Sequence, residues 1–81
     1  MSKIEKILDK IKSGKQDTNI SFDELKRAIK YFGFDLRVKG SHHIFYKTDI
    51  KEIINVQNNK GSAKPYQVKQ LRELVNKYSL K

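Results

Sequence analysis

Two adjacent histidines are the side chains in this sequence that point most directly to proton-transfer chemistry. His42 and His43 lie in the stretch KGSHHIFYK (residues 39–47), and they are the only histidines of the chain. An imidazole with an ordinary pKa of about 6.5 has both protonation states accessible near neutral pH, so it serves as a general base or a general acid. The local sequence leaves three uses open for the pair: catalysis, metal binding, or a structural position in a strand.

The strand geometry expected for residues 42–47 separates the two histidines. Successive side chains of a strand point to opposite faces, so His42 and Tyr46 share one face while His43 and Lys47 share the other. Two ligands on opposite faces cannot hold one ion, and the chain has no cysteine to complete a ligand set, so we expect no metal. Alternation alone does not decide which face is buried. A half-buried histidine that bonds to a backbone carbonyl is the structural alternative for either residue.

Metal-free cleavage of RNA is the reaction that fits one histidine in a cationic protein. A general base takes the proton of the 2′-hydroxyl, which attacks the adjacent phosphate, and a general acid protonates the leaving 5′ oxygen. Cations stabilise the charge that builds up on the phosphate. Lys39 and Lys47 flank the histidines and would supply that charge, and Tyr46 is a candidate for the second proton-transfer group. This chemistry requires no cofactor.

The charge of the chain favours an anionic partner. Eighteen Lys and Arg residues against nine Asp and Glu residues give a net charge of +9. Residues 60–81 alone hold six basic residues and one acidic residue, a net charge of +5. A positive field concentrated at one end of a small protein attracts a polyanion, most simply a nucleic acid.

A second group of lysines surrounds a predicted helix start at Pro65. Lys60 and Lys64 precede it, and Lys69 lies about one turn into the helix. Free N–H groups and the helix dipole favour phosphate at such a position. A solvated basic loop is the alternative, and Tyr66 either stacks on a base or packs against the protein.

Length and composition limit the class of protein. With 81 residues we expect a single domain over 1–81. The chain lacks an apolar run of the roughly 20 residues that a membrane span needs, and its first residues lack the apolar core of a secretory signal. Without cysteine there is no disulfide framework. We therefore expect a cytoplasmic protein with no membrane partner.

The hydrophobic period predicts the order α-α-β-β-β-α. Antiparallel strands with short connections and helices on one face form a two-layer α+β domain with a three-stranded sheet. Without its first helix this is also the order of double-stranded-RNA-binding domains. We expect helices over 3–13, from a cap at Ser21 to Gly33, and from Pro65 to Tyr78. We expect strands over 34–39, 42–47 and 51–57. Residues 14–19 and 58–64 are expected to form polar connections.

Local signals fix two of these boundaries. Ser21 and Glu24 have the spacing of a capping box, and Ile20 and Leu25 that of a hydrophobic staple, at the start of the second helix. Gly33 supplies the left-handed residue that ends it.

In the first strand, Phe34, Leu36 and Val38 alternate with charged residues, which predicts one buried face. The turns after this strand and after the next are expected at residues 39–40 and 48–49.

Two stretches carry a resemblance to a known family. The sequence VKGSHHIF (38–45), after a helix that ends in Phe-Gly-Phe, resembles the HicA toxins of type II toxin–antitoxin systems. The stretch AKPYQVKQ (63–70) is similar to a motif of one branch of that family. The resemblance extends over residues 21–78, with 3–13 as an accessory helix.

This resemblance implies a fold, an activity and a site. It implies a double-stranded-RNA-binding-like fold, ribosome-independent cleavage of mRNA, and a HicB-type antitoxin that covers the active site. The histidine after Gly40-Ser41 would be catalytic, which selects His42, with His43 as runner-up and Gly40 and Ser41 as the turn that presents it. Lys39, Lys47, Lys60, Lys64 and Lys69 would bind RNA.

Three points stay open at the level of sequence. The accessory helix either extends the core, mediates dimerisation or contacts the antitoxin, and the protein is a monomer or a weak dimer. The alternative function is a non-catalytic RNA-binding module with the same basic surface. A pure protein-interaction domain would leave the charge of residues 60–81 unexplained.

Overall fold

The computed structural model describes residues 3–58 and 60–80, so residue 59 of the predicted loop 58–64 lies outside the described residues. None of the helices in these ranges is long and apolar enough to cross a membrane. The elements in chain order are α1 (Lys3–Ser13), a short 3-10 turn (Asp17–Asn19), α2 (Phe22–Tyr31), β1 (Asp35–Lys39), β2 (His42–Lys47), β3 (Ile50–Gln57) and α3 (Pro65–Tyr78).

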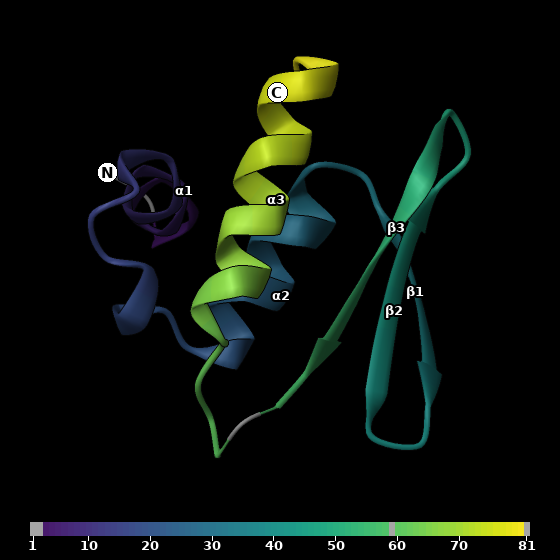
Figure 1. Cartoon of the computed structure of the whole chain (residues 1–81), viewed down its shortest axis with the longest axis horizontal. Coiled ribbons are helices and arrows are strands. Elements are labelled where there is room, and N and C mark those ends of the chain that lie inside the picture. The colour runs from purple at the N-terminus through teal and green to yellow at the C-terminus, as the bar shows by residue number, and fades with distance from the viewer. Residues whose placement is uncertain (1–2, 59, 81) are drawn as a thin grey trace.

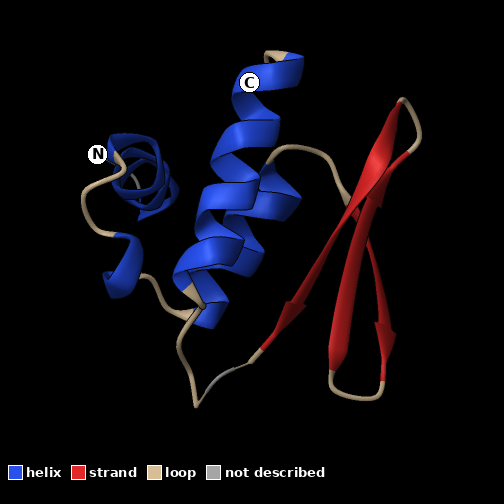
Figure 2. Cartoon of the chain, in the orientation of Figure 1, coloured by secondary structure: helices blue, strands red, loops and turns tan. Residues whose placement is uncertain are grey.

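The sheet and the helices form two layers. The strands are antiparallel in the order β1-β2-β3, so β2 is central. The helices lie on one side of the sheet, with α2 and α3 between it and α1 (Figure 1, Figure 2). Phe45, Ile54 and Val56 point into the interior and are fully buried, as expected for the inner positions of a strand with period two. The α+β fold predicted from the sequence is confirmed.

The start of α2 has the predicted cap. The Ser21 hydroxyl accepts the Glu24 N–H at 3.0 Å, and the Glu24 carboxylate accepts the Ser21 N–H at 3.0 Å. Lys10 of α1 donates to the same carboxylate at 3.3 Å. These bonds satisfy N–H groups that a helix start otherwise leaves without partners. They also tie α1 to α2.

The accessory helix α1 extends the core. Its buried residues Ile7, Leu8 and Ile11 belong to the same hydrophobic cluster as the apolar residues of α2 and α3. They recur at helical spacing, so one stripe of α1 is apolar and the rest is solvated. Of the three uses left open for this helix, the structure supports extension of the core.

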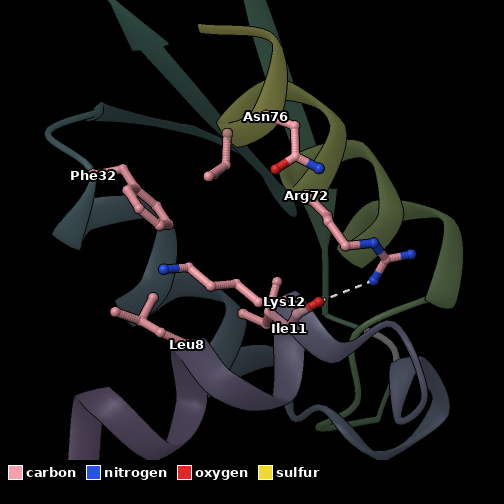
Figure 3. Close-up of a pocket in the computed structure, with 7 residues that line it drawn as sticks. Leu8, Ile11, Lys12, Phe32, Arg72 and Asn76 are labelled. Carbon is pink, nitrogen blue, oxygen red and sulfur yellow. Dashed lines mark hydrogen bonds between the residues drawn. The ribbon is translucent and has the colours of Figure 1, made fainter. Parts of the chain in front are cut away.

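The connection between α1 and α2 is not the plain linker that its polar sequence predicted. Arg72 of α3 donates two hydrogen bonds to the Asp17 carboxylate, at 2.8 and 3.0 Å. It donates a third to the Ile11 carbonyl at 3.0 Å (Figure 3). A planar guanidinium suits this forked geometry. One side chain therefore fixes the end of α1 and the 3-10 turn against α3.

Four details of the strands differ from the prediction, the first of which is that β1 begins at Asp35 rather than at residue 34. Val38 is 56% exposed although its alternation with charged residues predicted a buried position. β1 is an edge strand, separated from β3 by β2, and Val38 is its second-last residue, beside the hairpin turn. The first hairpin turn is Gly40-Ser41 rather than residues 39–40, and β3 begins at Ile50, one residue earlier than expected.

We predict that Asp17→Asn lowers the free energy of unfolding by about 1–2 kcal/mol at pH 7, because it removes the charged acceptor of a forked bond. The Arg72 guanidinium holds the pKa of Asp17 below its ordinary value of 3.8. A carboxylate whose pKa is lower in the folded state than in the unfolded state stabilises the fold. This stabilisation is fully present above the pKa of the unfolded state, and it is lost as the pH falls through the pKa of the folded state. The difference between wild type and variant should therefore shrink below about pH 4 in urea titrations.

The control for this prediction is Asp49→Asn, which removes the partner of Lys47 at 3.5 Å in a carboxylate that is 75% exposed. Its effect should stay below about 0.5 kcal/mol. Equal effects of the two substitutions, or a difference at Asp17 that does not depend on pH, would contradict the assignment.

Candidate functional site

The two histidines lie on opposite faces of β2, as strand alternation predicted. His42 is exposed on the outer face of the sheet. His43 is half-buried on the inner face, where its ring meets the edge of the Phe22 ring with 4.9 Å between centroids. The Nδ1 atom of His43 is buried and has no hydrogen-bond partner among the residues that the structure describes. The structure thus gives His42 access to a large substrate and gives His43 a packing position.

The hairpin between β1 and β2 presents His42 at the start of its strand. Lys39 and His42 are cross-strand partners that close a two-residue turn. Gly40 in this turn has φ of +60°, and Ser41 is not among the residues with positive φ. This is the pattern of a type II′ turn, in which glycine takes the first central position. No atom would obstruct a Cβ at Gly40, so its backbone conformation is what requires glycine.

Two amide side chains of β3 hold the imidazole of His42. The Asn55 Oδ1 atom lies 3.3 Å from Nδ1, and the Gln57 amide nitrogen lies 3.2 Å from Nε2 and 3.4 Å from Nδ1. An amide oxygen accepts only from a protonated nitrogen, so Asn55 favours the tautomer with its proton on Nδ1. Nε2 then carries the lone pair that a general base needs, and in the free protein this lone pair accepts the Gln57 N–H.

The start of α3 completes a hollow around His42. The hollow is lined by His42, Asn55, Gln57, Tyr66 and Gln67. Tyr66 is 61% exposed, so its hydroxyl is available to a ligand, whereas Gln67 is buried. The Gln67 side chain accepts the Lys64 N–H at 3.2 Å and so caps the helix. This arrangement places an imidazole, three amides and a phenol at one open hollow.

The loop before α3 is held in place by the start of α2. The Phe22 N–H donates to the Gly61 carbonyl, and the Ala63 N–H donates to the Ile20 carbonyl, both at 3.0 Å. Pro65 follows as the first residue of the helix, where the lack of an N–H costs nothing. These contacts fix where Tyr66 stands relative to the sheet.

The structure brings some of the predicted RNA-binding lysines to this site. Lys39 is the strand partner of His42. Lys64 is the N-cap of α3, and its Nζ lies 6.0 Å from the centre of the Tyr66 ring. Lys60 is exposed in the loop that leads from β3 to α3.

The other two predicted lysines have different surroundings. Lys47 points inward at the opposite end of β2, about 17 Å along the strand from His42, and pairs with Asp49 at 3.5 Å. Lys69 is exposed on α3 within 4.0 Å of Glu73. Its charge also lowers the pKa of Asp17, after the larger effect of Arg72. The structure therefore places Lys47 away from the site. The charge of Lys69 interacts with Glu73 and Asp17.

The structure also distinguishes the two tyrosines considered from the sequence. Tyr46 shares the outer face with His42 but stands four residues farther along β2, about 14 Å away. Tyr66, which the sequence left as either a stacking or a packing residue, lines the hollow of His42. The second proton-transfer group is thus better sought at Tyr66 than at Tyr46.

Three residues of the hollow were not anticipated from the sequence. Asn55 and Gln57 lie at alternate positions of β3 that face outward, so strand alternation predicts which face of the sheet they occupy. It does not predict that they contact His42. An irregularity between Phe45 and Lys47 shifts the β2–β3 register and sets Gln57 opposite His42. Gln67 had a signal, since glutamine at the third position of a helix can bond back to the cap.

A second cleft lies between the helices and has a different character. Its lining includes Leu8, Phe32 and Val75, with Lys12, Arg72 and Asn76 at its rim (Figure 3). The cleft lies on the helical side of the sheet, and none of its side chains exchanges a proton readily near neutral pH. We therefore place the candidate site at His42. Within the described residues, no three His, Cys, Asp or Glu side chains group as a metal site.

Comparison with known families matches residues 22–76 to the model described as HicA toxin of bacterial toxin–antitoxin systems. The match spans α2, the whole sheet and most of α3, and it omits α1. No curated protein and no solved structure shows detectable similarity to the chain.

The different faces of the histidines predict different effects on stability. His43→Ala should lower the free energy of unfolding by about 1–2 kcal/mol, because it removes a ring that packs against Phe22. His42→Ala should change it by less than about 0.5 kcal/mol, as is usual at exposed positions. Urea titrations of both variants check this, and a larger loss at His42 would show that its ring has a structural role.

Proposed function

The chain belongs to the HicA toxin family of bacterial toxin–antitoxin systems, and from this premise we propose that it is a ribosome-independent, metal-independent endoribonuclease that cleaves mRNA. The observation that carries the proposal is the exposed His42 imidazole, held by Asn55 and Gln57 in a hollow beside basic residues. The accompanying site assignment is His42 as the proton-transfer residue, presented by Gly40 and Ser41.

In the proposed reaction, Nε2 of His42 takes the proton of a 2′-hydroxyl. The 2′ oxygen attacks the adjacent phosphorus, the bond from phosphorus to the 5′ oxygen breaks, and that oxygen receives a proton. Asn55 supports the first step because its acceptor at Nδ1 leaves the lone pair on Nε2. That lone pair accepts the Gln57 N–H in the free protein, so the 2′-hydroxyl must displace the Gln57 amide to reach it. The same bond stabilises the imidazolium that forms, since its Nδ1–H donates to an amide oxygen.

The other groups of the hollow suit the remaining tasks. Lys39 and Lys64 would compensate the negative charge on the phosphate, as cations do for phosphoryl transition states. The Tyr66 hydroxyl is the proposed proton donor to the leaving oxygen. A phenolic O–H is a hydrogen-bond donor, so it can pass a proton to an oxygen atom beside it.

A toxin of such a system has an antitoxin partner, and we propose that it is of HicB type and covers the hollow of His42. An exposed site on an open sheet face is available to a protein that binds over it (Figure 2). The toxin would act in the cytoplasm, where mRNA is found, as a monomer or weak dimer. The accessory helix α1 lies on the far side of the helical layer from the sheet, so this mode of inhibition does not require it (Figure 1).

His42→Ala should reduce the cleavage of single-stranded RNA at least about 100-fold, which is the usual loss for a general base or acid. His43→Ala should retain most of the activity once the rate is corrected for the folded fraction. The measurement is the initial rate of product formation on gels, in the presence of EDTA, together with growth arrest on expression. If folded His43→Ala is inactive while His42→Ala cleaves RNA, the catalytic residue is His43. If wild type binds RNA without cutting it, the protein is a non-catalytic RNA-binding module.

Lysines at the hollow should contribute to binding through phosphate contacts. Lys39→Ala and Lys64→Ala should each weaken the binding of RNA. Each should also reduce the slope of log K against log salt concentration by about 0.7, which is the value for one phosphate contact on a single strand. Lys12→Ala, an exposed lysine of α1, is the matched control and should leave the slope unchanged. Fluorescence anisotropy over a range of salt concentrations provides the measurement. A wild-type affinity independent of salt would remove the electrostatic basis of the proposal.

A further inference from the structure

A second hollow lies on the outer face of the sheet, separate from that of His42. It is lined by Arg37 of β1, Ile44 and Tyr46 of β2, and Ile53 of β3. Tyr46 is 39% exposed and Ile53 is 53% exposed, although both are large and apolar. None of the helices formed by residues 3–58 and 60–80 covers this side of the sheet (Figure 2). Apolar side chains from two neighbouring strands, β2 and β3, together with Arg37 of β1 form a continuous surface, which marks a binding site more often than a solvated face.

This surface is continuous with the proposed catalytic site. His42, Ile44 and Tyr46 follow one another on the outer face of β2, so Ile44 stands between the imidazole and the tyrosine ring. The ring lies about 14 Å from His42 along the strand. An extended single strand with its reactive phosphate at His42 would reach Tyr46 within a few nucleotides.

The charges on this face favour a nucleic acid over an apolar protein surface. Arg37 is exposed, and within the described residues its guanidinium has neither an ion pair nor a hydrogen bond. Lys39 and Lys51 are also exposed at outward positions, and Asp35 is the one acidic residue at an outward position of the three described strands. The face thus combines flat apolar area with unneutralised positive charge, which is the combination that single-stranded RNA needs.

We propose that this hollow is a nucleobase-binding subsite for single-stranded RNA. A base stacks on the Tyr46 ring and contacts Ile44 and Ile53, while Arg37 stacks on the same base or binds its phosphate. Unpaired bases of RNA are commonly bound by aromatic rings and guanidinium planes in this way. The inference rests on the proposed function for the identity of the ligand, but it concerns how RNA is bound rather than how it is cut.

The test measures binding in a His42→Ala background, so that cleavage does not interfere. Fluorescence anisotropy compares a short single-stranded RNA with an abasic oligomer of the same length and charge. Tyr46→Ala should weaken the binding of RNA about 5- to 100-fold, the range for loss of one stacked base, and leave the abasic oligomer unaffected. Tyr46→Phe should retain binding, because stacking needs the ring and not the hydroxyl. Ile53→Ser, on another strand, should weaken the binding of RNA less strongly but with the same selectivity.

The matched control is Tyr31→Ala, since Tyr31 is 52% exposed but belongs to α2 rather than to the sheet. Its affinity for both oligomers should equal that of the background protein. Circular dichroism of each variant verifies the fold.

Three outcomes would overturn the subsite. These are unchanged RNA binding by Tyr46→Ala, an equal loss for RNA and the abasic oligomer, or sedimentation that shows a wild-type dimer dissociated by Tyr46→Ala. The last result would identify the face as an interface between two copies of the chain. Failure of the subsite is distinguishable from failure of the proposed function, because wild-type cleavage of RNA is measured separately and does not require Tyr46 to stack.

Discussion

The burial of Phe45 beneath the helices is the constraint on which the candidate site depends. Phe45 is fully buried in the middle strand. Because side chains alternate between the two faces of a strand, the inward position of Phe45 fixes the face of every other residue in β2. His43 must then point inward beside Phe45, while His42 points outward. A slip of one residue would bury His42 and expose Phe45, so the apolar core itself selects the histidine that meets solvent.

The hollow of His42 requires contacts from distant parts of the chain. The hairpin turn sets His42 at the start of β2, and β3 supplies the two amides that hold its ring. Tyr66 reaches the same place because the loop before α3 is bonded to the start of α2. That start is in turn fixed by the Ser21–Glu24 cap. A helix cap on the inner layer thus contributes indirectly to the geometry of a site on the outer face.

The accessory helix has a structural explanation that is independent of the site. The family match begins at residue 22, after α1 and the connection that follows it. α1 contributes Ile7, Leu8 and Ile11 to the core and is fastened through Arg72, which reaches both Ile11 and Asp17. Additional apolar burial is valuable in a chain of 81 residues, because small domains bury a lower fraction of their surface. The helix lies away from the outer sheet face, which leaves that face open for RNA or for an antitoxin (Figure 1).

The sequence by itself determined the order of elements, the cap of α2 and the opposite faces of the histidines, because these follow from local periods and short-range bonds. It did not determine the exposure of Val38, since that depends on how far the helices extend over an edge strand. It also missed the partners of His42. Only the tertiary structure decided them, because the irregular register between β2 and β3 sets Gln57 opposite His42, and packing against α2 brings Tyr66 to the same hollow. Local periodicity records which way a side chain points, whereas its neighbours depend on the docking of segments that are distant in the chain.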